Sequence, residues 1–343
     1  MSGPEQQVAG RASLGTIALL LIVVLLIAGG FHYMTDMPGG SYSGTLPALT
    51  EAEQELKDRL RRHVTVLAGD IGERNVWRHP ALEAASRYVE DQLRASGYRV
   101  AVQEYVARDQ PVRNLEAELY GAQLPGEIIV IGAHYDTVRG SPGANDNASG
   151  IAALLEIGRL LSGQALARTV RFVAFTNEEA PFFYSQEMGS RRYARRARQQ
   201  GDQIVAMLSL ETIGYYSDVA NSQHYPSRLY QLMYPDTGNF IGFVGNLSSR
   251  RLVRRCLASF RRDSAFPAEG VAAPGWMGGI HWSDHWSFWQ EGYPALMVTD
   301  TALFRYPYYH AATDTPDRLD YQRLARVVAG LARLAADLAR SGP

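Results

Sequence analysis

Short apolar runs alternate along the chain with segments in which apolar residues recur at helical spacing. The runs predict buried strands at 98–106, 115–119, 128–133, 170–175, 204–210, 239–245 and 294–299. The periodic segments predict helices at 49–67, 80–96, 151–161, 185–200, 248–261 and 319–340. Because strands and helices alternate, we predict an α/β fold, a three-layer sandwich with a mixed, largely parallel central sheet.

Residues 14–31 form an apolar stretch that only Thr16 interrupts. About 18 such residues are enough to span the hydrocarbon core of a bilayer. Arg11 precedes the stretch and no Lys or Arg follows until Lys57, so the positive-inside bias places the tail in the cytoplasm and the rest outside. We therefore predict one transmembrane helix in a single-pass protein of the cell (inner) membrane. A cleaved signal peptide is the alternative, although no clear A-x-A site follows.

A segment rich in Gly, Pro, Ser and Thr separates the apolar stretch from the remainder of the chain. Such a composition is typical of a linker. We therefore expect four parts: a cytoplasmic tail at 1–13, a transmembrane anchor at 14–31, a linker at 32–48 and one globular domain at 49–343.

The composition is typical of a protein with a large hydrophobic core and does not indicate binding to nucleic acid. Hydrophobic residues make up 46% of the 343 residues, which is enough for a large core, and the net charge of -1 gives no indication of a nucleic-acid partner. The one cysteine, Cys256, lies in a predicted helix, and we interpret it as a buried or partly buried thiol. The arginine-rich run at 191–198 is interpreted as a solvated helix face.

The most informative segment covers residues 132–150 and reads GAHYDTVRGSPGANDNASG. His134 and Asp136 end a predicted strand on the same side, because side chains alternate along a strand. Asp146 comes just before the next predicted helix, and sites in open α/β sheets form at such strand ends and helix starts. Taken alone, Asp146 also fits a turn or cap residue, and His134 fits a strand-end histidine bonded to Asp136.

More acidic and histidine side chains follow other predicted strands. Glu178 and Glu179 follow one strand, Glu211 ends the next, and His310 lies near the C-terminus. Adjacent carboxylates at a strand end are costly unless positive charge is nearby. Two imidazoles and several carboxylates without thiolates suit zinc, with Mn²⁺ or Co²⁺ as possible substitutes. One carboxylate can bridge two ions while another acts on the water between them.

The order of these motifs resembles the co-catalytic zinc aminopeptidase family, whose relatives include glutamate carboxypeptidase II and the glutaminyl cyclases. The matching pieces are H-x-D, D-N-x-S-G, E-E, an acidic residue before x-I-G, and a late His before D-T. The resemblance covers roughly 49–343, and its five pieces occur in the same order. It implies a zinc-peptidase (phosphorylase/hydrolase-like) fold and two Zn²⁺ ions.

The resemblance also implies which residues bind the metal. Asp146 matches the carboxylate that bridges the two ions. His134 and Glu211 match the other ligands of one zinc, and Glu179 and His310 match those of the second. Many members have Asp where Glu211 stands, so the identity and occupancy of that metal site stay open.

Three further roles follow from the same resemblance. Glu178 matches the general base, and Asp136 matches the carboxylate that orients the metal-binding His134. Tyr309 resembles a tyrosine that stabilises the oxyanion in some relatives, with a packed aromatic residue as the alternative. The peptide after the bridging Asp is often cis in relatives, which makes the Asp146–Asn147 bond a candidate for that geometry.

A second pair of histidines stands at helical spacing. His281 and His285 resemble a zincin helix, but Trp282 occupies the place where that motif needs Glu. The family commonly has Ser-Asp-His here, so we expect Ser283, Asp284 and His285 to support the site or the fold rather than bind metal.

The combined features predict a membrane-anchored di-zinc metallopeptidase with an extracytoplasmic catalytic domain. It would hydrolyse peptide bonds through a metal-bridging water, with Glu178 as general base, and it is most simply an aminopeptidase acting on peptide substrates. The alternatives are a carboxypeptidase-type exopeptidase and a glutaminyl cyclase-like acyltransferase. Relatives of the cyclase type usually lack the H-x-D pair, so His134 and Asp136 argue against that alternative.

Overall fold

The computed structural model describes residues 14–340, and the chain divides into two compact units, Met1–Asp36 and Met37–Pro343. In the first unit, α1 (Leu14–Thr35) is a 22-residue helix. Among the described residues it is the one helix that is long and apolar enough to cross a membrane, and a signal sequence meets the same criterion. The predicted cytoplasmic tail at 1–13 lies outside the described residues.

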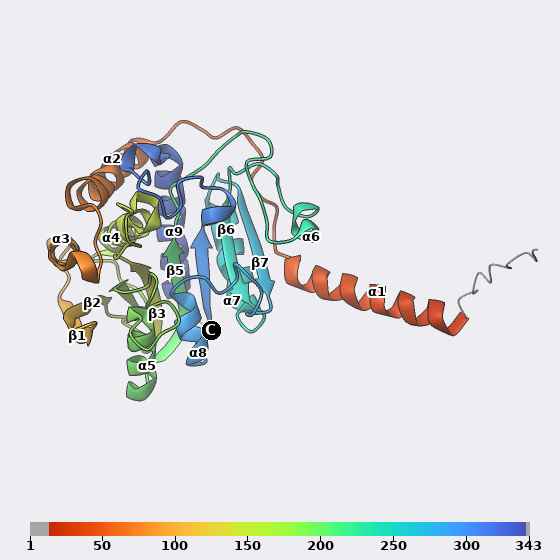
Figure 1. Cartoon of the computed structure of the whole chain (residues 1–343), viewed down its shortest axis with the longest axis horizontal. Coiled ribbons are helices and arrows are strands. Elements are labelled where there is room, and N and C mark those ends of the chain that lie inside the picture. Colours follow the sequence, from red (N-terminus) through yellow and green to blue (C-terminus); the bar gives the residue numbers. More distant parts are fainter. Residues whose placement is uncertain (1–13, 341–343) are drawn as a thin grey trace, which may run out of the picture. The chain divides into compact units, whose positions relative to one another are not determined.

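The second unit is built on one eight-stranded sheet with the order β1-β2-β4-β3-β5-β8-β6-β7 (Figure 1). The strands are β1 (Val100–Ala107), β2 (Gln110–Leu119), β3 (Leu124–His134), β4 (Arg168–Phe175), β5 (Gln203–Glu211), β6 (Ile241–Asn246), β7 (Ala268–Ala273) and β8 (Ala295–Thr299). β3, β4, β5 and β8 run parallel to one another, while β2 is antiparallel to β4, and β6 is antiparallel to β8. The predicted mixed, largely parallel sheet is confirmed, and β7 is the strand that the sequence pattern did not predict.

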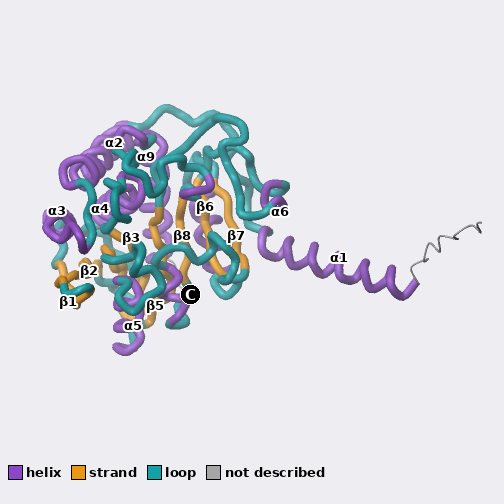
Figure 2. The backbone as a smooth tube through the Cα atoms, in the orientation of Figure 1, coloured by secondary structure: helices purple, strands orange, loops and turns teal. Residues whose placement is uncertain are grey.

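Helices cover both faces of this sheet, because β3 is apolar on both sides. Ile129 and Ile131 join the core of one face, and Ile128 and Val130 join the core of the other. The first face carries α2 (Glu51–Val64), α3 (His79–Ala95), α4 (Gly150–Leu161), α7 (Arg250–Asp263) and α9 (Tyr321–Arg340). The second face carries α5 (Gly189–Gln200) and α8 (His285–Gln290). Loops cross the upper edge of the sheet in Figure 2, where the parallel strands end.

The segment expected to be a linker is docked on the second unit from Met37 onward. Met37 packs against the core of the first face, and so does Leu46 further along. Arg261 of α7 donates hydrogen bonds to the carbonyl oxygens of Pro38 and Gly39, at 3.0 and 2.9 Å. Residues 37–48 therefore belong to the globular unit and do not form a free connection.

A buried carboxylate joins α2 to α4. Glu156 of α4 accepts hydrogen bonds from Arg59 Nε at 2.9 Å and from Arg159 Nε at 2.8 Å. His63 Nε2 of α2 lies 3.0 Å from the same carboxylate. Burial alone would raise the pKa of Glu156, but His63 and Arg159 outweigh it and lower the pKa to about 2. Because the pKa is depressed in the folded state, the ion pairs contribute stability above the unfolded pKa and lose it as the pH falls toward 2.

We expect Glu156→Gln to reduce the free energy of unfolding by about 1–3 kcal/mol at pH 7, since it leaves two partly buried arginines and a buried histidine without a counter-charge. The difference from the native chain should shrink as the pH is lowered from 5 toward 2. Urea unfolding in detergent across this pH range measures both effects. Arg94→Gln, which removes an exposed ion pair with Glu90, is the control and should change stability by less than about 0.5 kcal/mol. An equal effect of the two substitutions would contradict the stabilising role of Glu156.

Candidate metal centre

The parallel strands deliver the predicted site residues to one edge of the sheet. His134 is the last residue of β3, Glu211 is the last residue of β5, and Glu178 and Glu179 follow β4 closely. Asp146 lies in the turn Ala144–Ser149, just before α4. His310 arrives from the loop between β8 and α9. The carboxyl ends of parallel strands are the usual location of sites in α/β sheets.

Two groups of side chains converge on Asp146. His134 Nε2 lies 3.3 Å from Asp146 Oδ1 and 3.2 Å from Glu211 Oε2. On the other side, His310 Nε2 lies 3.1 Å from Asp146 Oδ2 and 3.4 Å from Glu179 Oε2. Within each group the candidate ligand atoms are all within 4.8 Å of one another. Asp146 therefore presents one carboxylate oxygen to each group, as a bridging ligand does.

The chemistry of these groups fits divalent cations. His134 Nε2, Asp146 Oδ1 and Glu179 Oε1 are buried and have no hydrogen-bond partner. Burial, followed by the charge of Asp146, raises the pKa of Glu179 to about 7. Unpaired buried acceptors and carboxylates are costly unless cations compensate them. Nitrogen and oxygen donors without sulfur are the set that zinc accepts in hydrolytic sites.

The same carboxylates raise the pKa values of the two imidazoles. Burial lowers the pKa of His134, but Glu211 and Glu178 outweigh it and raise the pKa well above its usual value. The pKa of His310 rises to about 10, because Asp146 and Glu179 outweigh its burial. The protein alone therefore supplies less positive charge than the carboxylates require, and bound cations would reverse these shifts.

Glu178 lies beside the two groups but belongs to neither of them. Its Oε2 is 3.9 Å from His134 Nε2, and burial raises its pKa well above the usual value. Asp136 fixes the backbone here, since its two carboxylate oxygens accept hydrogen bonds from the N–H groups of Glu178 and Glu179, at 3.1 and 3.2 Å. The same carboxylate is 3.6 Å from His134 Nδ1, while the Asp136 carbonyl oxygen is 3.3 Å away. Asp136 thus supports the Glu pair as well as the imidazole.

Polar contacts hold the turn that carries Asp146. Asp314 accepts hydrogen bonds from the N–H groups of Asn145 and Asp146, at 2.8 and 3.2 Å. The Asn147 side chain donates to Leu210 O at 2.8 Å, which ties the turn to the end of β5. The Asp146–Asn147 peptide is cis, as the resemblance predicted. Sequence reasoning assigned no role to Asp314, although it lies in the D-T piece of the motif.

Arg74 supports the loop between β3 and Asp146 and was not found from the sequence. Its guanidinium is fully buried and donates hydrogen bonds to five carbonyl oxygens, those of Leu67, Gly72, Tyr135, Pro142 and Gly143. Burial lowers the pKa of Arg74 to about 10. Gly143 itself has φ +62, and a Cβ there would lie 2.3 Å from Asp146 O, so only glycine fits. No local sequence pattern marks such an arginine.

Ser283 positions Glu211. Its Oγ donates a hydrogen bond to Glu211 Oε2 at 2.8 Å and lies 2.9 Å from Ser209 Oγ. The segment at 283–285 was expected to support the site or the fold, and Ser283 does so through its contact with Glu211. His281 and His285 are in neither of the two groups, and His285 Nε2 bonds to the carbonyl oxygen of Ile280 at 2.7 Å.

Tyr309 stacks on the imidazole of His310, with ring centroids 3.9 Å apart. Burial raises its pKa, and the charge of Asp146 adds to this effect. The phenol therefore keeps its proton and can donate a hydrogen bond.

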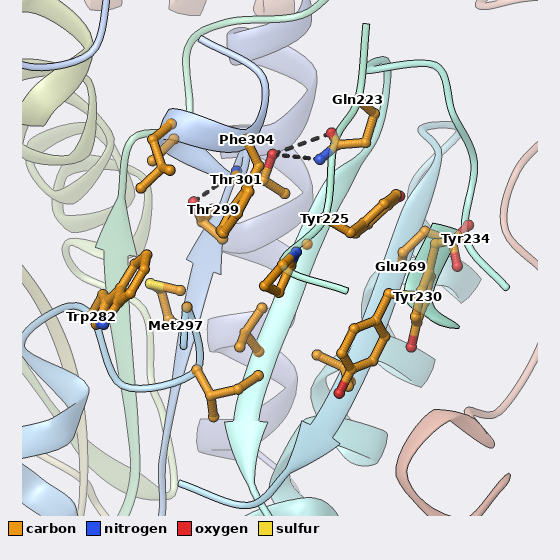
Figure 3. A pocket seen from close by; sticks show the side chains of 18 of the residues that line it. Gln223, Tyr225, Tyr230, Tyr234, Glu269, Trp282, Met297, Thr299, Thr301 and Phe304 are labelled. Atoms are coloured by element: carbon orange, nitrogen blue, oxygen red, sulfur yellow. Dashed lines mark hydrogen bonds between the residues drawn. The ribbon is translucent and has the colours of Figure 1, made fainter. Parts of the chain in front are cut away.

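A cavity of about 120 Å³ adjoins the site, and Glu211 and Tyr309 are among the residues that line it. In Figure 3, Trp282 and Met297 lie on one side of the cavity, and Tyr225, Tyr230 and Tyr234 lie on the other. Its lining is largely apolar, and the described lining residues include two carboxylates, Glu211 and Glu269, but no Lys or Arg.

Comparison with known proteins agrees with this geometry. Residues 114–335 match the sequence profile of peptidase family M28. The Escherichia coli (strain K12) protein YfbL is 38% identical over 285 residues, which are 81% of this chain and 87% of that protein. A probable leucine aminopeptidase of Arthroderma otae is 28% identical, and the match covers 61% of this chain and 54% of that protein. The chain thus spans about half the length of this relative.

Solved structures share the fold at low sequence identity. The zinc aminopeptidase BSAP from Bacillus subtilis has a TM-score of 0.67 at 13% identity, over 83% of this chain and 95% of that one. The glutaminyl cyclase of Fimbriiglobus ruber has a TM-score of 0.57 at 20% identity, over 87% and 98% of the two chains.

We expect Ser283→Ala to weaken zinc binding by about 10–100-fold, because Glu211 loses the hydrogen bond that orients it. Competition with a chromophoric zinc chelator measures the affinity. Ser287→Ala is the matched control, since Ser287 is also buried but bonds to Ser190 Oγ at 2.9 Å rather than to a candidate metal ligand. Native zinc affinity in the Ser283 variant would show that Glu211 does not depend on this contact.

Proposed function

Since the chain belongs to peptidase family M28, a family of zinc metallopeptidases, we propose that it is an aminopeptidase that works with two zinc ions. The observation that carries the number of ions is the position of Asp146, with one oxygen toward each histidine-containing group. We assign His134, Asp146 and Glu211 to the first ion, and Asp146, Glu179 and His310 to the second.

Each remaining residue of the site has a chemical task in this proposal. Bound zinc would polarise the scissile carbonyl and lower the pKa of water. Glu178 accepts the proton of the attacking water and transfers it to the leaving amine, a task that suits a carboxylate that lies beside the two groups and belongs to neither. The phenol of Tyr309 donates a hydrogen bond to the oxygen on which negative charge develops. Asp136 keeps Glu178 in place through the backbone.

The charge of the adjoining cavity favours an aminopeptidase over a carboxypeptidase. A free N-terminal ammonium is attracted by a carboxylate outside the two metal groups, such as Glu269, whereas a C-terminal carboxylate needs a cationic group. The described lining residues provide carboxylates and no Lys or Arg. The apolar remainder of the cavity suits an apolar side chain of the substrate.

A glutaminyl cyclase-like acyl transfer is the second candidate. The fold is compatible with it, since a cyclase is among the similar structures. His134 and Asp136 support peptide hydrolysis instead, because relatives of the cyclase type usually lack the H-x-D pair, and both groups of candidate ligands are complete.

We also propose the cellular arrangement. The apolar composition of α1 supports an uncleaved anchor, with the tail at 1–13 in the cytoplasm and the peptidase domain at 49–343 outside the cytoplasm. The segment at 32–48 connects the two, and from Met37 onward it is docked on the peptidase domain.

We expect Glu178→Gln to keep its zinc and to lose turnover by about 10²–10⁴-fold, since the amide cannot accept the proton of water. Zinc content by elemental analysis and hydrolysis of aminoacyl-nitroanilides test the two halves of this expectation. Glu187→Gln in the following loop is the control and should retain activity. Full activity in the Glu178 variant would remove it as the general base.

A substrate comparison tests the type of peptidase. We expect hydrolysis of leucyl-nitroanilide, and a loss of at least about 100-fold when the leucine is N-acetylated, because acetylation removes the ammonium. Release of the C-terminal residue from N-acetylated peptides would favour a carboxypeptidase. Formation of pyroglutamate from N-terminal glutamine would favour the cyclase.

A further inference from the structure

We propose that the peptidase domain docks on the surface of the lipid bilayer through an apolar rim beside β7, made of Leu229, Leu232, Met233 and Trp276. The inference rests on the anchoring role proposed for α1. It goes beyond that role, because an anchor on a free linker would leave the domain without a fixed bilayer-facing surface.

The rim residues are large, apolar and exposed. Leu232 is 82% exposed, Met233 is 56% exposed and Trp276 is 81% exposed. Leu229 belongs to the short helix α6 (Arg228–Gln231), and Leu232 follows its last residue. Tyr230 of α6 contacts Met277, the residue after Trp276, with 3.9 Å between Oη and Sδ. Exposed apolar side chains that cluster in this way mark interaction sites.

The docked segment enters the domain next to this rim. Met37 packs beside Gly270 of β7, since a Cβ at Gly270 would lie 3.3 Å from Met37 Cγ. Tyr234, which directly follows Met233, donates a hydrogen bond to the carbonyl oxygen of the same glycine at 2.7 Å. One residue of the edge strand therefore contacts both the start of the docked segment and the end of the rim.

Because the connection between α1 and the docked segment is short, the bilayer is the partner expected to cover the rim. Only Asp36 separates Thr35, the last residue of α1, from Met37. A chain reaches about 3.6 Å per residue, so the end of the apolar helix lies within about 7 Å of Met37 at any helix angle. A bilayer that holds α1 must then come within reach of the rim. A second copy of the protein, by contrast, has no such tether.

The side chains suit the bilayer interface. Leucine and methionine contribute apolar area, and tryptophan is enriched at the level of the lipid headgroups. Arg228, at the start of α6, is exposed and can extend its guanidinium toward phosphate groups. Arg261 holds Pro38 and Gly39, so the domain has little slack with which to leave the surface.

Depth-dependent fluorescence quenching tests the proposal on the full chain. In a Cys256→Ala background, Leu232→Cys carries a nitrobenzoxadiazole label, and the protein is placed in nanodiscs of phosphatidylcholine and phosphatidylglycerol with doxyl-labelled lipids. Val106→Cys is the matched control, since it is 63% exposed and lies on β1, at the opposite edge of the sheet. We expect quenching at 232 to exceed quenching at 106 several-fold. Equal quenching at the two positions would overturn the proposal.

Two further results separate the possible failures. Carbonate extraction of the full chain from membranes tests the anchor, and release of the chain would overturn both the anchor and the docking. Retention of the chain without lipid quenching at 232 would overturn the docking alone. A blue-shifted but unquenched label at 232 would indicate contact with protein, such as a second copy, and would also overturn it. Hydrolysis of a water-soluble substrate by both labelled variants verifies their fold.

Discussion

Electrostatic repulsion among buried carboxylates is the constraint on which the rest of the structure depends. Asp146, Glu178, Glu179 and Glu211 meet at one edge of the sheet, where burial raises the pKa of the three glutamates. Two imidazoles lie among them, which is too little positive charge for so many desolvated acids. Bound divalent cations would compensate this negative charge. The parallel strands matter because they bring residues that are far apart in sequence to this one place.

The residues around the cluster orient it through backbone N–H groups and neutral side chains. Asp136 and Asp314 direct their oxygens to backbone N–H groups, so their negative charge is satisfied away from the ligand atoms. Ser283 supplies a neutral donor to Glu211. Asn147 ties the Asp146 turn to the end of β5 through a neutral amide. Each acid in the inner group is therefore oriented by a partner that leaves its charge available for a cation.

The sequence predicts those features that have a local pattern. The strands that carry His134 and Glu211 contain clear apolar runs, and the motif pieces fall at their ends, so the fold class and the juxtaposition of the site residues follow. β7 has a glutamate and a glycine within six residues, so its pattern is too weak to predict a strand. Arg74 bonds to carbonyl oxygens, which any residue supplies, so no spacing reveals it. Residues 38 and 39 bond to Arg261, more than 220 positions away, so composition alone predicts only a linker for this segment.

The carbonyl contacts of Arg74 bear on how the centre exchanges its ions. The guanidinium holds Tyr135, Pro142 and Gly143 by itself, so the loop keeps its shape without help from any ligand atom. Emptying and refilling of the centre would then involve the ligand side chains, whose movements are fast compared with refolding of a loop. A chain of this kind is suited to replacement of zinc by cobalt, whose visible absorption would report on the ligands directly.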